Sequence, residues 1–97
     1  MNEFYNYKKN PSVVCTELDD GAVLLNLDSK CYYTLNETGL RIWQIMEEIQ
    51  SPVEISKRLV NEYEVDAEIA RVSVFKLIEQ LEREDLISSI KVSSPRK

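Results

Sequence analysis

The 97-residue sequence contains no histidine, two glycines and two cysteines. Without histidine, the chain lacks the side chain that most often acts as a general base and as a nitrogen ligand of zinc. Gly21 and Gly39 are too far apart to form a glycine-rich phosphate-binding loop. Cys15 and Cys31 do not form a CxxC pair. We therefore expect a protein that is not an enzyme and that has no cofactor and no metal site.

The sequence also lacks the segments that direct a chain into or across a membrane. No apolar run approaches the ~20 residues that a membrane-spanning helix needs, and the first residues do not resemble a signal peptide. We expect a cytoplasmic protein with no membrane partner. One disulfide between Cys15 and Cys31 is an alternative, but two reduced thiols suit that location better. The net charge of −5 argues against nucleic acid as a partner, because phosphate binding relies on clustered Lys and Arg.

The first part of the chain predicts three strands joined by short turns. Residues 13–18, 22–27 and 31–35 are rich in β-branched, aromatic and other apolar residues. Asp19-Asp20-Gly21 and Asp28-Ser29-Lys30 separate them with residues that favour turns. Strands connected in this way form an antiparallel meander, which leaves the third strand at an edge of the sheet.

The second part predicts three helices, each opened by a residue that can cap it. Asn36, Ser51 and Asp66 carry side-chain oxygens that can accept from the free N–H groups of a first helical turn. The helices are expected at residues 37–49, from Ser51-Pro52 to about residue 63, and at residues 67–84. The fold class is therefore α+β, with a three-stranded meander followed by three helices, in outline a winged helix-turn-helix.

A single domain accounts for this pattern. We place it at residues 13–87, where Leu86-Ile87 returns to the core after the third helix. A loosely held, polar, partly aromatic N-terminal arm is expected at residues 1–12, and a polar C-terminal tail at residues 88–97.

The third helix carries apolar residues outside its core stripe. Phe75 lies on one flank of that stripe and Val72 lies nearly opposite it, because helical residues advance by ~100° each. The charged residues Glu68, Arg71 and Glu79 surround them. One interpretation is a wide core stripe in which Phe75 packs against the sheet. The other is one wall of a peptide groove, with the third strand as the opposite wall.

Two segments of the sequence resemble the PqqD-like family of leader-peptide recognition elements. They are Glu17-Leu18-Asp19-Asp20-Gly21-Ala22-Val23-Leu24-Leu25-Asn26-Leu27-Asp28 and Tyr32-Tyr33-Thr34-Leu35-Asn36-Glu37-Thr38-Gly39-Leu40-Arg41-Ile42-Trp43. The similarity covers residues 13–87 and is most specific at the strand-to-helix segment 35–39. It is closest to the small stand-alone members that serve lasso peptide biosynthesis.

The resemblance implies a protein that binds the leader of a ribosomally made precursor peptide. It implies delivery to a cysteine-protease-like leader peptidase and, as a further partner, to an ATP-dependent macrolactam synthetase. The family's leaders lie between the third strand and the third helix and carry an aromatic residue, a proline and a leucine as anchors. We expect strand addition here. The expected binding residues are Lys30, Cys31, Tyr32, Tyr33, Thr34 and Leu35 on the strand, and Glu68, Arg71, Val72, Phe75 and Glu79 on the helix.

Two other interpretations of function stay open at this point. One is a PqqD-type chaperone that serves a radical-SAM enzyme or another peptide-modifying enzyme. The other is a winged-helix protein that binds DNA, which the third helix disfavours because acidic residues outnumber basic ones along it.

Overall fold

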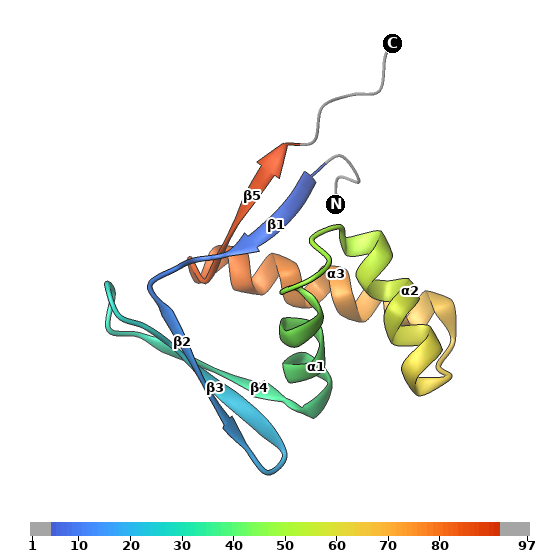
Figure 1. The fold of residues 1–97 in the computed structure, drawn as a ribbon, viewed down its shortest axis with the longest axis horizontal. Coiled ribbons are helices and arrows are strands. Elements are labelled where there is room, and N and C mark those ends of the chain that lie inside the picture. The colour runs from blue at the N-terminus through green and yellow to red at the C-terminus, as the bar shows by residue number, and fades with distance from the viewer. Residues whose placement is uncertain (1–4, 92–97) are drawn as a thin grey trace.

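The computed structural model of the protein describes residues 5–91. The elements along them are β1 (Tyr5–Lys9), β2 (Val13–Leu18), β3 (Gly21–Asn26), β4 (Tyr32–Asn36), α1 (Glu37–Ile45), α2 (Pro52–Tyr63), α3 (Ala67–Arg83) and β5 (Ile87–Lys91). β2, β3 and β4 form an antiparallel sheet in that order, and the three helices follow in the chain (Figure 1). The predicted α+β fold class is confirmed.

The three-stranded sheet turns one face toward the helices. Ala22 and Leu24 of β3 and Leu35 of β4 are buried on that face, whereas Val14 of β2 and Tyr32 of β4 are exposed on the other. This alternation follows from the two-residue period of a strand. At the start of β3, Gly21 lies so close to β4 that a Cβ atom there would collide with the Leu35 carbonyl oxygen.

The helices begin where the capping residues predict. The Asn36 side-chain oxygen accepts from the Gly39 N–H at 2.8 Å, and the Asp66 carboxylate accepts from the Glu68 N–H at 2.8 Å. α1 ends at Ile45 rather than at the expected residue 49. The Glu47 and Glu48 N–H groups donate to carbonyls three residues back, so the chain tightens into a turn there.

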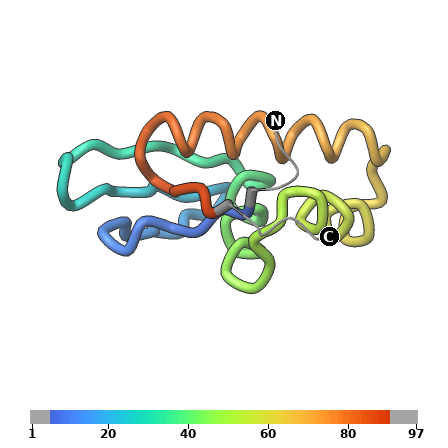
Figure 2. Tube along the Cα trace, turned by 90° about the horizontal axis from the view of Figure 1, so that it is seen from above, coloured from blue at the N-terminus to red at the C-terminus, as the bar shows by residue number. Residues whose placement is uncertain are grey.

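The core lies between the sheet and the helices. α1 packs on β3 and β4, and α2 packs on α3. Seen from above, α3 extends along one side of the domain, beside β4 (Figure 2). No helix within residues 5–91 is both long enough and apolar enough to cross a membrane. The residues that are at most 1% exposed in this core include Leu24, Ile42, Ile45, Met46, Ile55, Val74, Ile78 and Leu81.

A second, two-stranded sheet joins the two ends of the described chain. β1 pairs antiparallel with β5, so that Tyr7 lies opposite Ser89 (Figure 1). The expectation of a loosely held arm and a polar tail is thereby corrected for residues 5–9 and 88–91. Tyr7 is 4% exposed, and its N–H donates to the Gln50 carbonyl at 3.0 Å, so burial and backbone pairing hold the arm in place. Residues 1–4 and 92–97 of the expected arm and tail lie outside the described residues.

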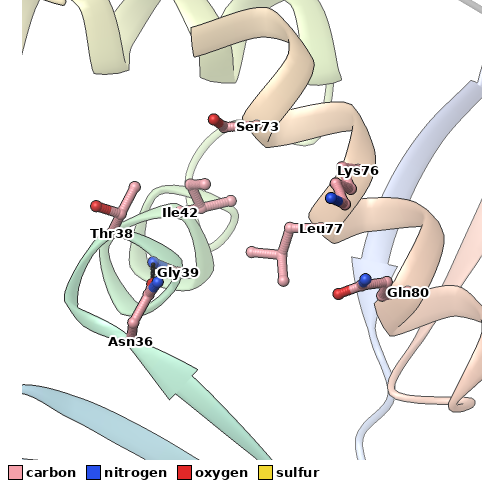
Figure 3. A pocket seen from close by; sticks show the side chains of 8 residues that line it. All are labelled: Asn36, Thr38, Gly39, Ile42, Ser73, Lys76, Leu77 and Gln80. Carbon is pink, nitrogen blue, oxygen red and sulfur yellow. Dashed lines mark hydrogen bonds between the residues drawn. The ribbon is translucent and has the colours of Figure 1, made fainter. Parts of the chain in front are cut away.

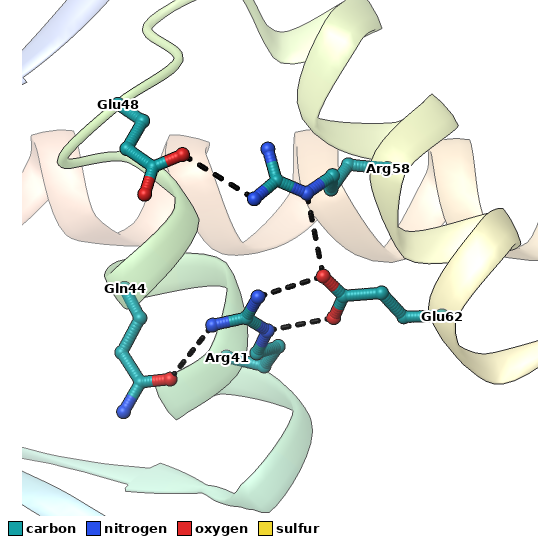
Figure 4. A network of polar contacts seen from close by, with 5 residues as sticks. All are labelled: Arg41, Gln44, Glu48, Arg58 and Glu62. Atoms are coloured by element: carbon teal, nitrogen blue, oxygen red, sulfur yellow. Dashed lines mark hydrogen bonds and ion pairs between the residues drawn. The ribbon is translucent and has the colours of Figure 1, made fainter.

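A polar network joins α1 to α2 on the surface. The Arg41 guanidinium donates to both carboxylate oxygens of Glu62, at 2.6 and 2.7 Å, and Arg58 reaches Glu62 and Glu48 from α2 (Figure 4). The hydrogen bond from Arg41 lowers the pKa of Glu62, and the same hydrogen bond raises the pKa of Arg41. This bidentate pair links α1 to α2 with defined geometry.

We expect Gly21→Ala to lower the free energy of unfolding by about 2 kcal/mol, because the new methyl group would collide with backbone atoms of β4 that cannot move away independently. Urea denaturation followed by circular dichroism measures this. Thr16→Ala on the exposed face of β2 is the control, with a change below about 0.5 kcal/mol. Equal stability of Gly21→Ala and the wild type would contradict the close approach of β3 and β4.

Arg41→Gln should lower the free energy of unfolding by about 1 kcal/mol at neutral pH. In the folded protein the pKa of Glu62 is below its ordinary value, so the pair stabilises the fold fully above about pH 4.3. This contribution disappears as the pH falls through the lowered pKa of Glu62. Urea denaturation at several pH values should show the two proteins converging in acid. A difference in unfolding free energy that does not change with pH would show that the ion pair between Arg41 and Glu62 is not its cause.

Candidate functional site

The outer edge of β4 presents unpaired backbone groups. Within residues 5–91, β3 pairs with one side of β4 and no strand pairs with the other. The Cys31 carbonyl accepts from the Asn26 N–H at 2.9 Å, so the backbone polar groups at positions 31, 33 and 35 point toward β3. The N–H and C=O groups of Tyr32 and Thr34 therefore point away from the sheet, where another strand can pair with them.

A cavity of about 310 Å³ lies where β4 ends and α3 passes beside it. We call this cavity the cleft. In Figure 3 one wall comes from the β4–α1 junction and the other from α3, from which Leu77 projects between them. The lining residues are Asn36, Thr38, Gly39 and Ile42 on the first wall and Ser73, Lys76, Leu77 and Gln80 on the second.

One hydrogen bond ties the two walls together. The Tyr33 hydroxyl on β4 donates to the Gln80 side-chain oxygen on α3 at 2.6 Å. Tyr33 is half-buried and packs against the core, so its ring is held while its hydroxyl reaches the helix. This contact sets the separation between α3 and β4 beside the open edge.

A smaller cavity of about 180 Å³ continues from the cleft along α3. Thr38 and Ser73 line both cavities, so the two are neighbours, and we call them together the groove. Apolar side chains dominate this extension, and Ile69 and Val65 are exposed at it. We call it the apolar extension; its lining is Thr38, Leu59, Tyr63, Val65, Ile69, Ala70 and Ser73.

The groove has the chemistry of a binding surface. Lys76 is the single charged side chain among the residues that line the cleft and the apolar extension. Among residues 5–91, no group of three or more carboxylate, thiol or imidazole side chains could hold a metal ion. Open backbone groups beside a partly apolar groove can bind an extended peptide through its main chain and alternate side chains.

The strand residues predicted from the sequence lie at this edge. Tyr32, Tyr33, Thr34 and Leu35 belong to β4, and Lys30 and Cys31 lead into it. Tyr32 is 73% exposed, whereas Leu35 is 3% exposed. The Leu35 side chain therefore belongs to the core, and of the six strand residues it is the one whose side chain cannot reach a ligand.

The helix residues predicted from the sequence lie elsewhere on α3. None of Glu68, Arg71, Val72, Phe75 and Glu79 lines the cleft or its apolar extension. Glu68 and Arg71 bond to each other at 3.2 Å and line a shallow pocket against α2. Phe75 follows Arg71 by one helical turn, is half-buried and lies on the same flank, whereas Val72 is 54% exposed.

The α3 residues that line the cleft are not among those predicted from the sequence. Leu77 appears on the core stripe of the helix, and Ser73, Lys76 and Gln80 lie on the polar flank next to it. The core stripe of α3 has two flanks. The large apolar side chain of Phe75 indicated a binding surface on the flank that does not line the cleft. The direction from which β4 approaches decides which flank faces it.

Comparisons with known proteins agree with this geometry. A family model described as coenzyme PQQ synthesis protein D (PqqD) matches residues 21–87. The chain is similar to the structure of TbiB1 in complex with the TbiA(beta) leader peptide, with 32% sequence identity, a TM-score of 0.76, and coverage of 84% of this chain and 94% of that chain. It is also similar to a lasso peptide synthetase B1 complexed with the leader peptide, with 28% identity, a TM-score of 0.75, and coverage of 86% and 98%. No curated protein matches the sequence.

Tyr33→Phe should cost about 1 kcal/mol of unfolding free energy, because it removes the hydrogen bond between the walls and leaves the Gln80 amide without that partner. Tyr32→Phe is the matched control, since the Tyr32 hydroxyl has no hydrogen-bond partner among residues 5–91 and its side chain is 73% exposed. Urea denaturation compares the two variants with the wild type. Equal stability of both variants would show that the contact between Tyr33 and Gln80 contributes nothing.

Proposed function

The chain belongs to the PqqD family, and from this premise we propose that it binds the leader of a ribosomally made precursor peptide in lasso peptide biosynthesis. The observation that carries the proposal is the open edge of β4 beside the cleft on α3. The two similar proteins described above are complexes with leader peptides, and the similarity extends over most of this chain and theirs.

The proposed mode of binding is strand addition. The leader lies antiparallel to β4 and exchanges main-chain hydrogen bonds with Tyr32 and Thr34, whose N–H and C=O groups point outward. Such bonds give affinity with little preference for sequence. Alternate leader side chains face α3 and meet Ser73, Leu77 and Gln80 in the cleft.

The apolar extension supplies the preference for particular leaders. The family resemblance implies leaders with an aromatic residue, a proline and a leucine as anchors, and a cavity of about 180 Å³ lined by Leu59, Val65 and Ile69 is suited to one such side chain. Burying about 150 Å² of an anchor contributes about 4 kcal/mol at ~25 cal/mol per Å². Ordering a disordered leader offsets part of this, so we expect affinity in the micromolar range or somewhat tighter.

The protein acts without catalysis in this scheme. Bound leader would be presented to a cysteine-protease-like leader peptidase and then to an ATP-dependent macrolactam synthetase, as the resemblance implies. Because such a precursor is made by ribosomes, the proposal implies that the protein acts in the cytoplasm. The support is the similarity to a lasso peptide synthetase B1 complexed with the leader peptide.

A PqqD-type chaperone for a radical-SAM or other modifying enzyme is the second candidate function. The family model, whose description names coenzyme PQQ synthesis, is the observation that favours it. Fluorescence titration against a lasso leader and against a leader from a quinone-cofactor precursor separates the two candidates. Tighter binding of the leader from the quinone-cofactor precursor would overturn the proposed role in lasso peptide biosynthesis. The proposed strand addition to β4 would still stand.

Thr34→Pro should weaken binding of a fluorescent synthetic leader at least tenfold. The substitution removes an outward N–H donor and leaves the bonds between β4 and β3 in place, since Thr34 does not donate to β3. Fluorescence anisotropy measures the dissociation constant, with the leader taken from the precursor encoded beside this gene.

Glu17→Pro is the matched control for that experiment. Glu17 lies on β2, the opposite edge of the sheet, where its N–H also points away from β3 because the Ser12 carbonyl accepts from Leu27. This variant should keep wild-type affinity, and circular dichroism should show that both variants are folded. Equal affinities of a folded Thr34→Pro variant and the wild type would count against strand addition.

A further inference from the structure

The charges on α3 are separated between its two flanks. On the flank away from β4, Glu68 pairs with Arg71 at 3.2 Å, and Glu79 lies further along the same side. Among the α3 residues that line the cleft, the charged one is Lys76. A chain with a net charge of −5 thus has a groove in which a cation faces the ligand and no carboxylate lines the wall.

Lys76 also differs from most cations of the described chain in having no anionic partner. No carboxylate lies within ion-pair distance of its ammonium group among residues 5–91. Glu37 precedes Thr38 at the first wall but does not line the cleft. The cations that do pair with carboxylates are Lys9, Arg41, Lys57, Arg58 and Arg71.

A peptide in the cleft would remove water from around Lys76. An ammonium group that loses water without gaining an acceptor is costly, whereas a carboxylate nearby offsets the loss. Lys76 is exposed in the free protein, so its charge is solvated until a ligand arrives. A leader that fills the cleft is therefore favoured when it carries an anionic side chain at this position.

The position of Lys76 specifies which part of the leader carries this side chain. Lys76 shares the cleft with Asn36, the last residue of β4. In an antiparallel pair, the N-terminal end of the added strand lies beside the C-terminal end of β4. The anionic side chain therefore belongs at the N-terminal end of the paired leader segment.

We propose that Lys76 makes this protein selective for leaders with an Asp or Glu at the N-terminal end of the segment that pairs with β4. This rests on the leader-binding function proposed above. It is opposite to the preference for basic leader residues that the carboxylates of Glu68 and Glu79 would impose if the leader lay against them. It assigns Lys76 as a specificity-determining residue that contacts the peptide side chain and has no role in holding the fold.

The test is a charge reversal with a compensating change in the peptide. Lys76→Glu should weaken binding of the fluorescent leader about tenfold, and the loss should shrink as ionic strength rises. Replacing the acidic residue at the N-terminal end of the leader segment by Lys should weaken binding to the wild type similarly. Combining the two changes should restore most of the affinity, which a merely structural role of Lys76 would not do.

Two further variants test whether the effect of Lys76→Glu depends on the position of the charge. Lys57→Glu on α2 makes the same change of net charge at an exposed site outside the cleft, and should bind like the wild type. Arg71→Glu reverses a charge on the other flank of α3. If Arg71→Glu loses the leader and Lys76→Glu keeps it, the peptide contacts the flank predicted from the sequence, and the selectivity of Lys76 is overturned.

The remaining outcomes separate this inference from the function on which it rests. If the wild type binds the leader and Lys76→Glu matches Lys57→Glu, the charge selectivity fails and leader recognition stands. Tight binding of a leader that has no acidic residue in its paired segment would also overturn the charge selectivity. If the wild type does not bind the leader of its own precursor, both proposals fail.

Discussion

The direct passage from β4 into α1 is the constraint on which the rest of the structure depends. Asn36 is at once the last residue of β4 and the N-cap of α1, and its side chain accepts from the Gly39 N–H at 2.8 Å. With no loop between the two elements, the direction of the strand sets the direction of the helix. Leu35 anchors the strand in the core immediately before this point, and Gly21 lets β3 approach it closely. The cleft lies between this junction and α3.

A preformed groove suits a protein that must capture a disordered segment. An unpaired edge strand usually risks uncontrolled pairing with other chains. Here α3 lies beside the edge, and the bond between Tyr33 and Gln80 sets their spacing, so that a single extended peptide can enter between them. The ordering cost on binding then falls mainly on the peptide, because the walls are already in place.

Charged residues divide between structural and recognition roles. Arg41 and Arg58 bind Glu62 and Glu48 across α1 and α2, and Lys9 lies 4.5 Å above the Trp43 ring while its ammonium group bonds to Glu47. These contacts hold elements together outside the cleft, which none of these residues lines. In the cleft, Lys76 has no ion-pair partner among residues 5–91, which is why we propose that it meets an anionic side chain of the ligand.

The sequence by itself determined the three-stranded meander, the three helices and the family of this protein. Helix starts at Asn36, Ser51 and Asp66 were predictable because capping is local chemistry, and the strands of the meander were predictable because turn residues separate them. The pairing of β1 with β5 was not, because its register depends on two segments about 80 residues apart in the chain.

Tertiary structure alone decided which flank of α3 faces β4. The sequence shows the core stripe of that helix but carries no local signal for the direction from which the sheet approaches it. The placement of α3 beside the β4–α1 junction is therefore what identifies three cleft residues, Ser73, Lys76 and Gln80. The open edge of β4 could be predicted from the strand and its neighbouring turns. The α3 residues opposite that edge depend on how the helix packs in the folded domain.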